Sequence, residues 1–85
     1  MTGFTYTITH PLGLHARPAA ALTELCRSLT SQITITKGDR NISATSLVPL
    51  LLLEVQQGDT ISVTLEGPRE IEESQALMAY FQANL

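Results

Sequence analysis

Apolar and hydroxyl-bearing residues alternate strictly in three separate stretches of this sequence. Residues 4–9, 32–37 and 60–66 place branched aliphatic or aromatic side chains at every second position, with threonine or serine between them. A period of two is typical of a strand that has one buried and one solvated face. Residues 40–44 predict a further strand, and the turn residues at 38–39 favour an antiparallel hairpin with the strand before it.

Between these stretches the apolar residues recur at intervals of three and four, which indicates helices. The first predicted helix begins at Ala16 and directs Thr23 and its polar neighbours toward water. A short leucine-rich helix is predicted over residues 47–53, and a last helix over residues 69–84. The expected apolar stripe of the first helix consists of Ala19, Leu22, Leu25, Cys26 and Leu29.

The last predicted helix divides into two faces by the same periodicity. The face expected to point inward carries Ile71, Ser74, Leu77, Met78 and Phe81. The face expected to point outward carries Glu70, Glu72, Glu73 and Gln82. The acidic residues crowd the first turn, where negative charge is favourable for the helix dipole, so we interpret them as helix stabilisers.

The elements follow one another as strand, helix, strand, strand, helix, strand, helix, which predicts an α+β fold of the form βαββαβα. We expect a two-layer open-faced sandwich in which one four-stranded antiparallel sheet is covered on one face by three helices. Eighty-five residues suffice for one hydrophobic core, so residues 1–85 are predicted to form a single domain. The order of the strands does not follow from the pattern.

Charge and cysteine content exclude several classes of function. The net charge is −3 and only five Lys and Arg residues are present, which argues against nucleic acid as a partner. Cys26 is the single cysteine, so no internal disulfide can form, and we expect a reducing, cytoplasmic location without a signal peptide. Because Cys26 lies on the apolar stripe of its helix, we expect it to be a core residue. No apolar run has the length of a membrane span, and no residues show zinc-ligand spacing.

His15 stands immediately before the first helix, where the first backbone N–H groups have no intrahelical acceptor. Gly13 permits a sharp turn there, and Pro18 removes an N–H that the first turn leaves unpaired. The helix dipole and the guanidinium of Arg17 favour a neutral imidazole, which has a lone pair for attack. These features predict a nucleophile that carries a phosphoryl group, although spacing alone favours an ordinary helix-start residue that is hydrogen-bonded to the first turn. His10, across the turn, is interpreted as a solvated loop residue.

The heptapeptide from Gly13 to Ala19, GLHARPA, resembles the active-site signature of the HPr family, histidine-containing phosphocarriers of the bacterial phosphoenolpyruvate-dependent sugar phosphotransferase system. The resemblance extends over the whole chain and implies the strand order 1-4-2-3. It implies that phosphorylated Enzyme I donates to His15, at Nδ1, and that His15 donates to IIA domains of sugar permeases. It also implies that Arg17 and the amides of Ala16 and Arg17 stabilise the phosphate, with no metal or cofactor, in a monomer.

The leucine-rich second helix adds two further expectations. Ser46 is predicted to be its N-cap, with a hydroxyl that can reach only the amide of Val48 because Pro49 has no N–H. The family resemblance implies a second use for Ser46, as a target of a regulatory serine kinase. Leu50, Leu51 and Leu53 are expected in the core. A partner-docking surface is predicted from Leu12, Ala16, Leu47 and Val48.

Two other classes of function remain open at this point. An HPr-like regulatory module would act by binding a transcription factor or a metabolic enzyme, and His15→Gln would preserve its interaction. A small enzyme using His15 as a general base would need a deep polar pocket. Thr45, Pro49, Glu54 and Glu24 depart from residues common in the family, which fits a specialised paralogue and weakens the expectation for Ser46.

Overall fold

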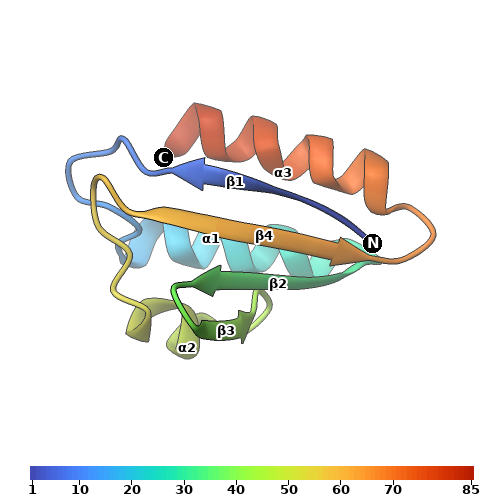
Figure 1. Cartoon of the computed structure of the whole chain (residues 1–85), viewed down its shortest axis with the longest axis horizontal. Coiled ribbons are helices and arrows are strands. Elements are labelled where there is room, and N and C mark those ends of the chain that lie inside the picture. The colour runs from blue at the N-terminus through green and yellow to red at the C-terminus, as the bar shows by residue number, and fades with distance from the viewer.

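A computed structural model describes the whole chain, residues 1–85, and contains the seven predicted elements in the predicted order (Figure 1). None of the three helices combines the length and the apolar character that crossing a bilayer requires. The elements are β1 (Thr2–Thr7), α1 (Ala16–Ser28), β2 (Gln32–Lys37), β3 (Arg40–Ser43), α2 (Leu47–Leu52), β4 (Thr60–Glu66) and α3 (Glu70–Asn84).

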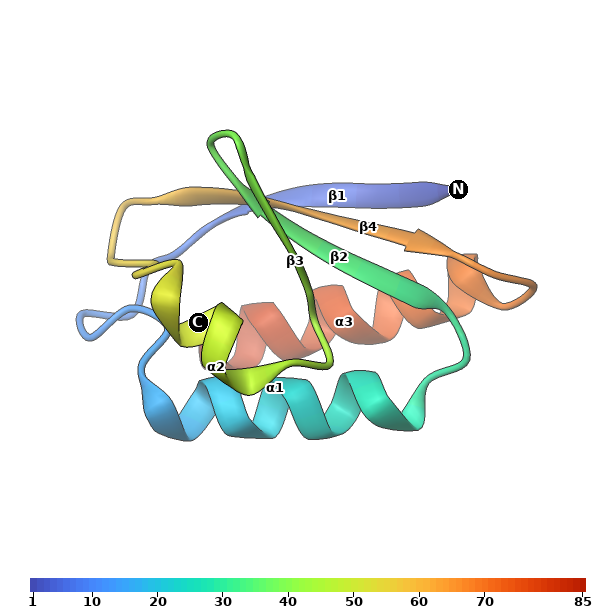
Figure 2. The ribbon, with the colours of Figure 1, turned by 90° about the horizontal axis from the view of Figure 1, so that it is seen from below.

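The four strands form one antiparallel sheet in the order β1-β4-β2-β3, which confirms the expected topology. Figure 2 shows the strands on one side and all three helices on the other, so the sheet is covered on a single face. The predicted bounds of β1 are wrong by two residues. β1 pairs with β4 from Thr2 opposite Leu65 to Thr7 opposite Thr60, and Ile8 stays buried after the chain has left the ladder.

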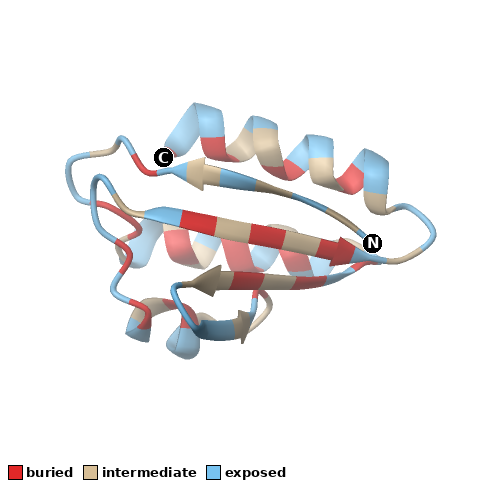
Figure 3. Ribbon diagram, in the orientation of Figure 1, coloured by how far each residue is buried: buried red, intermediate tan, exposed pale blue.

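The core lies between the sheet and the helices (Figure 3). Phe81 of α3 is fully buried and packs edge-to-face against two rings of β1, with centroid distances of 5.6 Å to Phe4 and 5.4 Å to Tyr6. Cys26 lies on the buried stripe of α1, as expected, and burial raises the pKa of its thiol to about 12. The alternating strands and the helical stripe of α1 therefore meet in one apolar interior.

Two positions of α3 contradict the predicted faces. Ile71 is 65% exposed, whereas Glu73 is buried. The carboxylate of Glu73 accepts hydrogen bonds from the backbone amides and hydroxyls of both Thr30 and Ser31, at 2.5 to 3.1 Å. These donors, led by the Ser31 hydroxyl, lower the pKa of Glu73 to about 2. Glu73 thus ties α3 to the α1–β2 connection, a use that the helical pattern does not reveal.

Thr23 is the corresponding correction on α1. It was expected on the solvated side, but it is buried, and its hydroxyl donates to the carbonyl oxygen of Ala20 at 2.9 Å. A hydroxyl that is paired within its own helix can be buried at little cost. The buried stripe of α1 is therefore wider than its apolar residues alone.

The end of α2 is held by cations from the β2–β3 hairpin. Lys37 donates from Nζ to the carbonyl oxygens of Leu53 and Glu54, at 3.0 and 2.8 Å, and Arg40 donates to that of Leu52 at 3.0 Å. Such donors satisfy carbonyls that a helix end leaves free. Glu54 follows with a φ of 53°, the left-handed conformation for which glycine is favoured, so its side chain imposes backbone strain there.

Leu85 contacts the loop that follows β1. The main-chain oxygen of Leu85 accepts hydrogen bonds from the amides of Thr9 and His10, at 2.7 and 2.9 Å, and from the Thr9 hydroxyl at 3.1 Å. The side chain of Leu85 is buried in the core. This contact fixes the start of the loop that leads to His15.

Candidate functional site

His15 occupies the N-cap position of α1 and has an extended backbone, with a φ of −84° and a ψ of −177°. The helix begins at Ala16, and the carbonyl oxygen of His15 accepts the first intrahelical bond, from Ala19 at 3.0 Å. Pro18 has no N–H, and no protein group accepts from the amides of Ala16 and Arg17. Two unpaired backbone N–H groups therefore lie at the helix end beside the histidine, as the sequence predicts.

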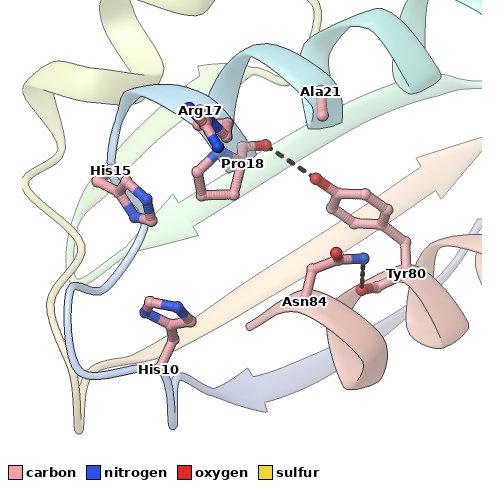
Figure 4. Close-up of a pocket in the computed structure, with 7 residues that line it drawn as sticks. All are labelled: His10, His15, Arg17, Pro18, Ala21, Tyr80 and Asn84. Atoms are coloured by element: carbon pink, nitrogen blue, oxygen red, sulfur yellow. Dashed lines mark hydrogen bonds between the residues drawn. The ribbon is translucent and has the colours of Figure 1, made fainter.

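The imidazole lines an open hollow of about 360 Å³ (Figure 4). His15 itself is half-buried, so its ring is accessible and yet held by its surroundings. The hollow is formed by the loop before α1, the first turns of α1 and the last turns of α3. It is lined by His10, His15, Arg17, Pro18, Ala21, Tyr80 and Asn84.

The turn before the helix depends on the glycine at position 13. Gly13 has a φ of 63°, and a Cβ placed there would lie 2.5 Å from the carbonyl oxygen of Val55. The same carbonyl accepts the amide of Leu14 at 2.9 Å. Only glycine fits both this φ and this close contact, because other residues are strained at this φ and their Cβ would clash with the backbone of Val55. The loop is thereby packed against the segment that leads into β4.

One ring nitrogen of His15 has a neighbour within the loop. Nδ1 lies 3.3 Å from the carbonyl oxygen of Gly13. A carbonyl oxygen only accepts, so a hydrogen bond here puts the proton on Nδ1 and leaves the lone pair on Nε2. Attack through Nδ1, which the family resemblance implies, requires the ring to leave this contact and to carry its proton on Nε2.

Arg17 lies in the same hollow, with an exposed side chain. Its guanidinium forms no hydrogen bond or ion pair within the chain. Figure 4 shows it next to Pro18, at the start of the helix. An unpaired guanidinium is free to turn toward an anion that arrives at this point, and its planar fork suits phosphate.

Tyr80 is a site residue that sequence reasoning missed. Its hydroxyl donates to the carbonyl oxygen of Pro18 at 3.0 Å, across the gap between α3 and α1. Burial raises the pKa of Tyr80, so the hydroxyl remains a donor over the ordinary pH range. The first turn of α1 is therefore anchored from the far end of the chain. No local motif around residue 80 carries this information.

His10 also differs from expectation, because it is half-buried and lies beside His15. The two ring centroids are 5.4 Å apart, with planes inclined at 33°. Nδ1 of His10 accepts the backbone amide of Leu12 at 3.1 Å. The spacing of five residues across a Pro-Gly loop gave no reliable indication that the rings would meet, since it depends on the path of the loop.

The residues predicted for docking and regulation lie around α2 and the site loop. Leu12 and Val48 are 68% and 64% exposed, Ala16 is exposed, and Leu47 is only half-buried against the core. Leu52 is a further exposed leucine, while Leu50 and Leu53 are buried as expected and Leu51 is half-buried against the core.

Ser46 stands at the N-cap position of α2, but its side chain makes no capping hydrogen bond. The expected bond to the amide of Val48 is therefore wrong, although the position is right. The hydroxyl of Ser46 forms no other hydrogen bond within the chain and is half-buried. No group of three or more His, Cys, Asp or Glu side chains lies close enough together to hold a metal ion.

Comparison with known proteins gives one consistent family. The family model described as "PTS HPr component phosphorylation site" matches residues 3–83. The chain is 37% identical to phosphocarrier protein HPr of Cupriavidus necator over 73 residues, 86% of this chain and 82% of that protein. It is 34% identical to phosphocarrier protein NPr of Klebsiella oxytoca over 80 residues, covering 93% and 89%.

A solved structure agrees with these relatives. The crystal structure of HPr-C-His from Thermoanaerobacter tengcongensis superposes with a TM-score of 0.92 at 32% identity, covering 98% of this chain and 93% of that one. The chain combines a half-buried histidine at the start of α1, free amides beside it and the sheet order β1-β4-β2-β3. It therefore belongs to the HPr family of phosphotransferase-system phosphocarriers.

Proposed function

We propose that His15 accepts a phosphoryl group from phosphorylated Enzyme I and passes it to IIA domains of sugar permeases. The observation that carries this proposal is the position of His15 at the N-cap of α1, on an open hollow beside two unpaired amides and a free guanidinium. An open hollow suits a carrier, because both donor and acceptor must bring their own phosphohistidine or histidine to the same ring. A deep pocket, which the general-base alternative requires, is not what this site offers.

The transfer is a single displacement at phosphorus. The lone pair of a neutral ring nitrogen of His15 forms the new N–P bond while the N–P bond of the donor phosphohistidine breaks, and its electron pair returns to the donor ring. If Nδ1 is the attacking atom, the proton of the neutral His15 ring stays on Nε2 throughout, and the contact of Nδ1 with Gly13 is released first. ³¹P spectroscopy of the phosphorylated protein distinguishes the two ring isomers.

Charge at the helix end supports both halves of the cycle. Before transfer, the partial positive charge of the α1 N-terminus and the guanidinium of Arg17 attract the phosphoryl group that a donor brings to His15. After transfer, the same groups face a phosphoryl dianion, which the amides of Ala16 and Arg17 and the guanidinium stabilise. Neither set of interactions needs a change of fold, which suits a carrier that is loaded and unloaded repeatedly. Phosphoryl transfer depends mainly on such positioning and charge stabilisation.

Docking of both partners is assigned to the apolar surface formed by Leu12, Ala16, Leu47 and Val48. Leu12 and Val48 are the most exposed members of this set. We further assign Ser46 as a site for a serine kinase, supported by a hydroxyl without an intramolecular partner. Phosphate there would add negative charge near the docking surface and slow loading of His15. The protein is expected to act as a monomer in the cytoplasm.

The test is incubation with phosphoenolpyruvate and catalytic Enzyme I, followed by a IIA acceptor. We expect acid-labile, alkali-stable phosphate on the wild-type protein, its loss to the IIA domain, and no label on His15→Ala. His10→Ala leaves the acceptor in place and should still take up label, so it shows that labelling depends on His15 and not on the neighbouring imidazole. Absence of label while an active control carrier is phosphorylated contradicts the proposal. A regulatory binding module would show that result and keep its partner with His15→Gln.

A further inference from the structure

The imidazole of His10 lies next to that of His15, and the proposed relay does not use it. The ring centroids are 5.4 Å apart, and both rings line the same hollow (Figure 4). No other side chain forms a hydrogen bond with either ring. A group carried on the ring of His15 and projecting into the hollow therefore has the ring of His10 as an immediate neighbour.

Hydrogen bonding fixes which nitrogen of His10 can act as a donor. The backbone amide of Leu12 donates to Nδ1 at 3.1 Å, so Nδ1 carries the lone pair and, in the neutral ring, the proton is on Nε2. The Nε2–H has no acceptor within the chain. A half-buried donor that lacks a partner is satisfied by solvent or by a ligand that enters the hollow.

The backbone of His10 is held as firmly as its ring. Its amide donates to the main-chain oxygen of Leu85 at 2.9 Å, and its carbonyl oxygen accepts the amide of Gly13 at 2.9 Å. With the ring bound to Leu12 as well, the side chain is positioned before any ligand arrives. Pre-positioned donors stabilise a charged group without the cost of ordering them.

We propose that the Nε2–H of His10 donates a hydrogen bond to an oxygen of the phosphoryl group on His15, an inference that rests on the proposed phosphocarrier function. Arg17 and the helix amides approach the phosphoryl group from the start of α1, and His10 approaches it from the loop before the helix. The phosphoryl group is then held from two sides. No bond other than this hydrogen bond forms or breaks, so His10 acts as a phosphoryl-binding residue.

His10→Asn is the discriminating variant. The side-chain oxygen of asparagine accepts an amide two residues on, as in an Asx-turn, so the bond from Leu12 is kept. Its amide group is too short to replace Nε2. His10→Gln has a longer side chain that carries a donor farther into the hollow and should restore much of the effect. Equal thermal midpoints of the three proteins show that the fold is unchanged.

The experiment uses phosphoramidate, a chemical donor, so that His15 is phosphorylated without Enzyme I. In ¹⁵N-histidine-labelled wild-type protein, we expect the Nε2–H proton of His10 to shift downfield and to exchange more slowly after phosphorylation. Phosphorylated wild-type protein is then mixed with an equal amount of His10→Asn and catalytic Enzyme I. At equilibrium, the phosphoryl group should favour the wild-type protein by about tenfold, as for one hydrogen bond to a charged group.

An unchanged His10 resonance in the chemically phosphorylated protein overturns the inference, whatever Enzyme I does. An equal partition between wild type and His10→Asn overturns it as well. Failure of Enzyme I to load His15, with a shifted His10 resonance, instead contradicts the proposed relay and leaves the hydrogen bond supported. The two proposals therefore fail in different arms of the experiment.

Discussion

The hydroxyl of Tyr80 and the carbonyl oxygen of Pro18 are joined by a hydrogen bond of 3.0 Å. This bond links α3 to the first turn of α1, one residue beyond the free amide of Arg17. Because the phosphate-binding donors of the proposed site belong to that turn, we expect Tyr80 to stabilise their position through this bond.

Tyr80→Phe is expected to lower the free energy of unfolding by about 1 kcal/mol, the usual net contribution of one hydrogen bond. Phosphorylation of His15 by Enzyme I should slow severalfold, because the first turn of α1 loses its anchor. Tyr6→Phe is the matched control, since the Tyr6 hydroxyl makes no hydrogen bond within the chain and its ring also contacts Phe81. Urea unfolding and single-turnover phosphorylation measure both quantities. Equal losses in the two variants would contradict the assigned role.

Val48 and Ile71 form a matched pair for testing the docking surface, because their side chains are 64% and 65% exposed. Val48→Glu is expected to raise the KM for the carrier in the Enzyme I reaction by about tenfold, since a charge enters an apolar interface. Ile71→Glu, on α3, should leave that KM unchanged. Both variants should unfold within about 0.5 kcal/mol of the wild type. A similar KM for the two variants would remove Val48 from the docking surface.

The lowered pKa of Glu73 predicts that the folded protein loses stability in acid. Its pKa is about 2 in the folded protein, against an ordinary value of 4.5, because Ser31 and Thr30 donate to the ionised carboxylate. As the pH falls below about 4.5 the unfolded chain binds the proton first, so stability is lost progressively down to about pH 2. Asp59 and Glu70, whose pKa values are also lowered, act in the same direction.

Glu73→Gln should therefore be less stable than the wild type at pH 7 and should lose less stability between pH 5 and pH 3. Ser31→Ala removes the strongest donor to the carboxylate and should show the same trend in part. Urea midpoints of the wild type and both variants, measured between pH 5 and pH 3 and at pH 7, test this prediction. A wild-type acid slope that survives intact in Glu73→Gln would place its origin elsewhere.

Glu54 is strained by its φ of 53°. Glu54→Gly is expected to raise the free energy of unfolding by up to about 1 kcal/mol, because glycine adopts this conformation without a Cβ clash. Glu54→Ala removes the carboxylate but keeps the Cβ, so it should stay within about 0.5 kcal/mol of the wild type. The carbonyl bonds from Lys37 are available in all three proteins. A destabilised glycine variant would contradict this account.

Much of the fold follows from local sequence, whereas the errors at Glu73 and at the ends of β1 involve partners that are distant in the chain. Glu73 lies four residues before Leu77 and eight before Phe81, so its spacing places it on the buried stripe of α3. Its charge argued for water, and only the donors at Thr30 and Ser31 reverse that argument. The register of β1 was likewise set by its pairing with β4, which the alternation of residues 4–9 does not contain.

The site shows the same division. The position of His15 at the start of a helix, the need for Gly13 and the unpaired amides follow from seven consecutive residues and from the rules of helix ends. The contact of His10 with His15 and the anchoring by Tyr80 do not, because they depend on the path of a loop and on the docking of α3. Whether these residues act as proposed stays a prediction.

The hydrogen bonds from Thr9 and His10 to Leu85 have a consequence for biosynthesis. The loop that carries the histidine is made early on the ribosome, whereas Leu85, which holds the first residues of this loop, is made later. The hydrogen bonds to Leu85 can form only after residue 85 has emerged, so we expect Enzyme I to phosphorylate chains stalled before that residue more slowly than chains that include it.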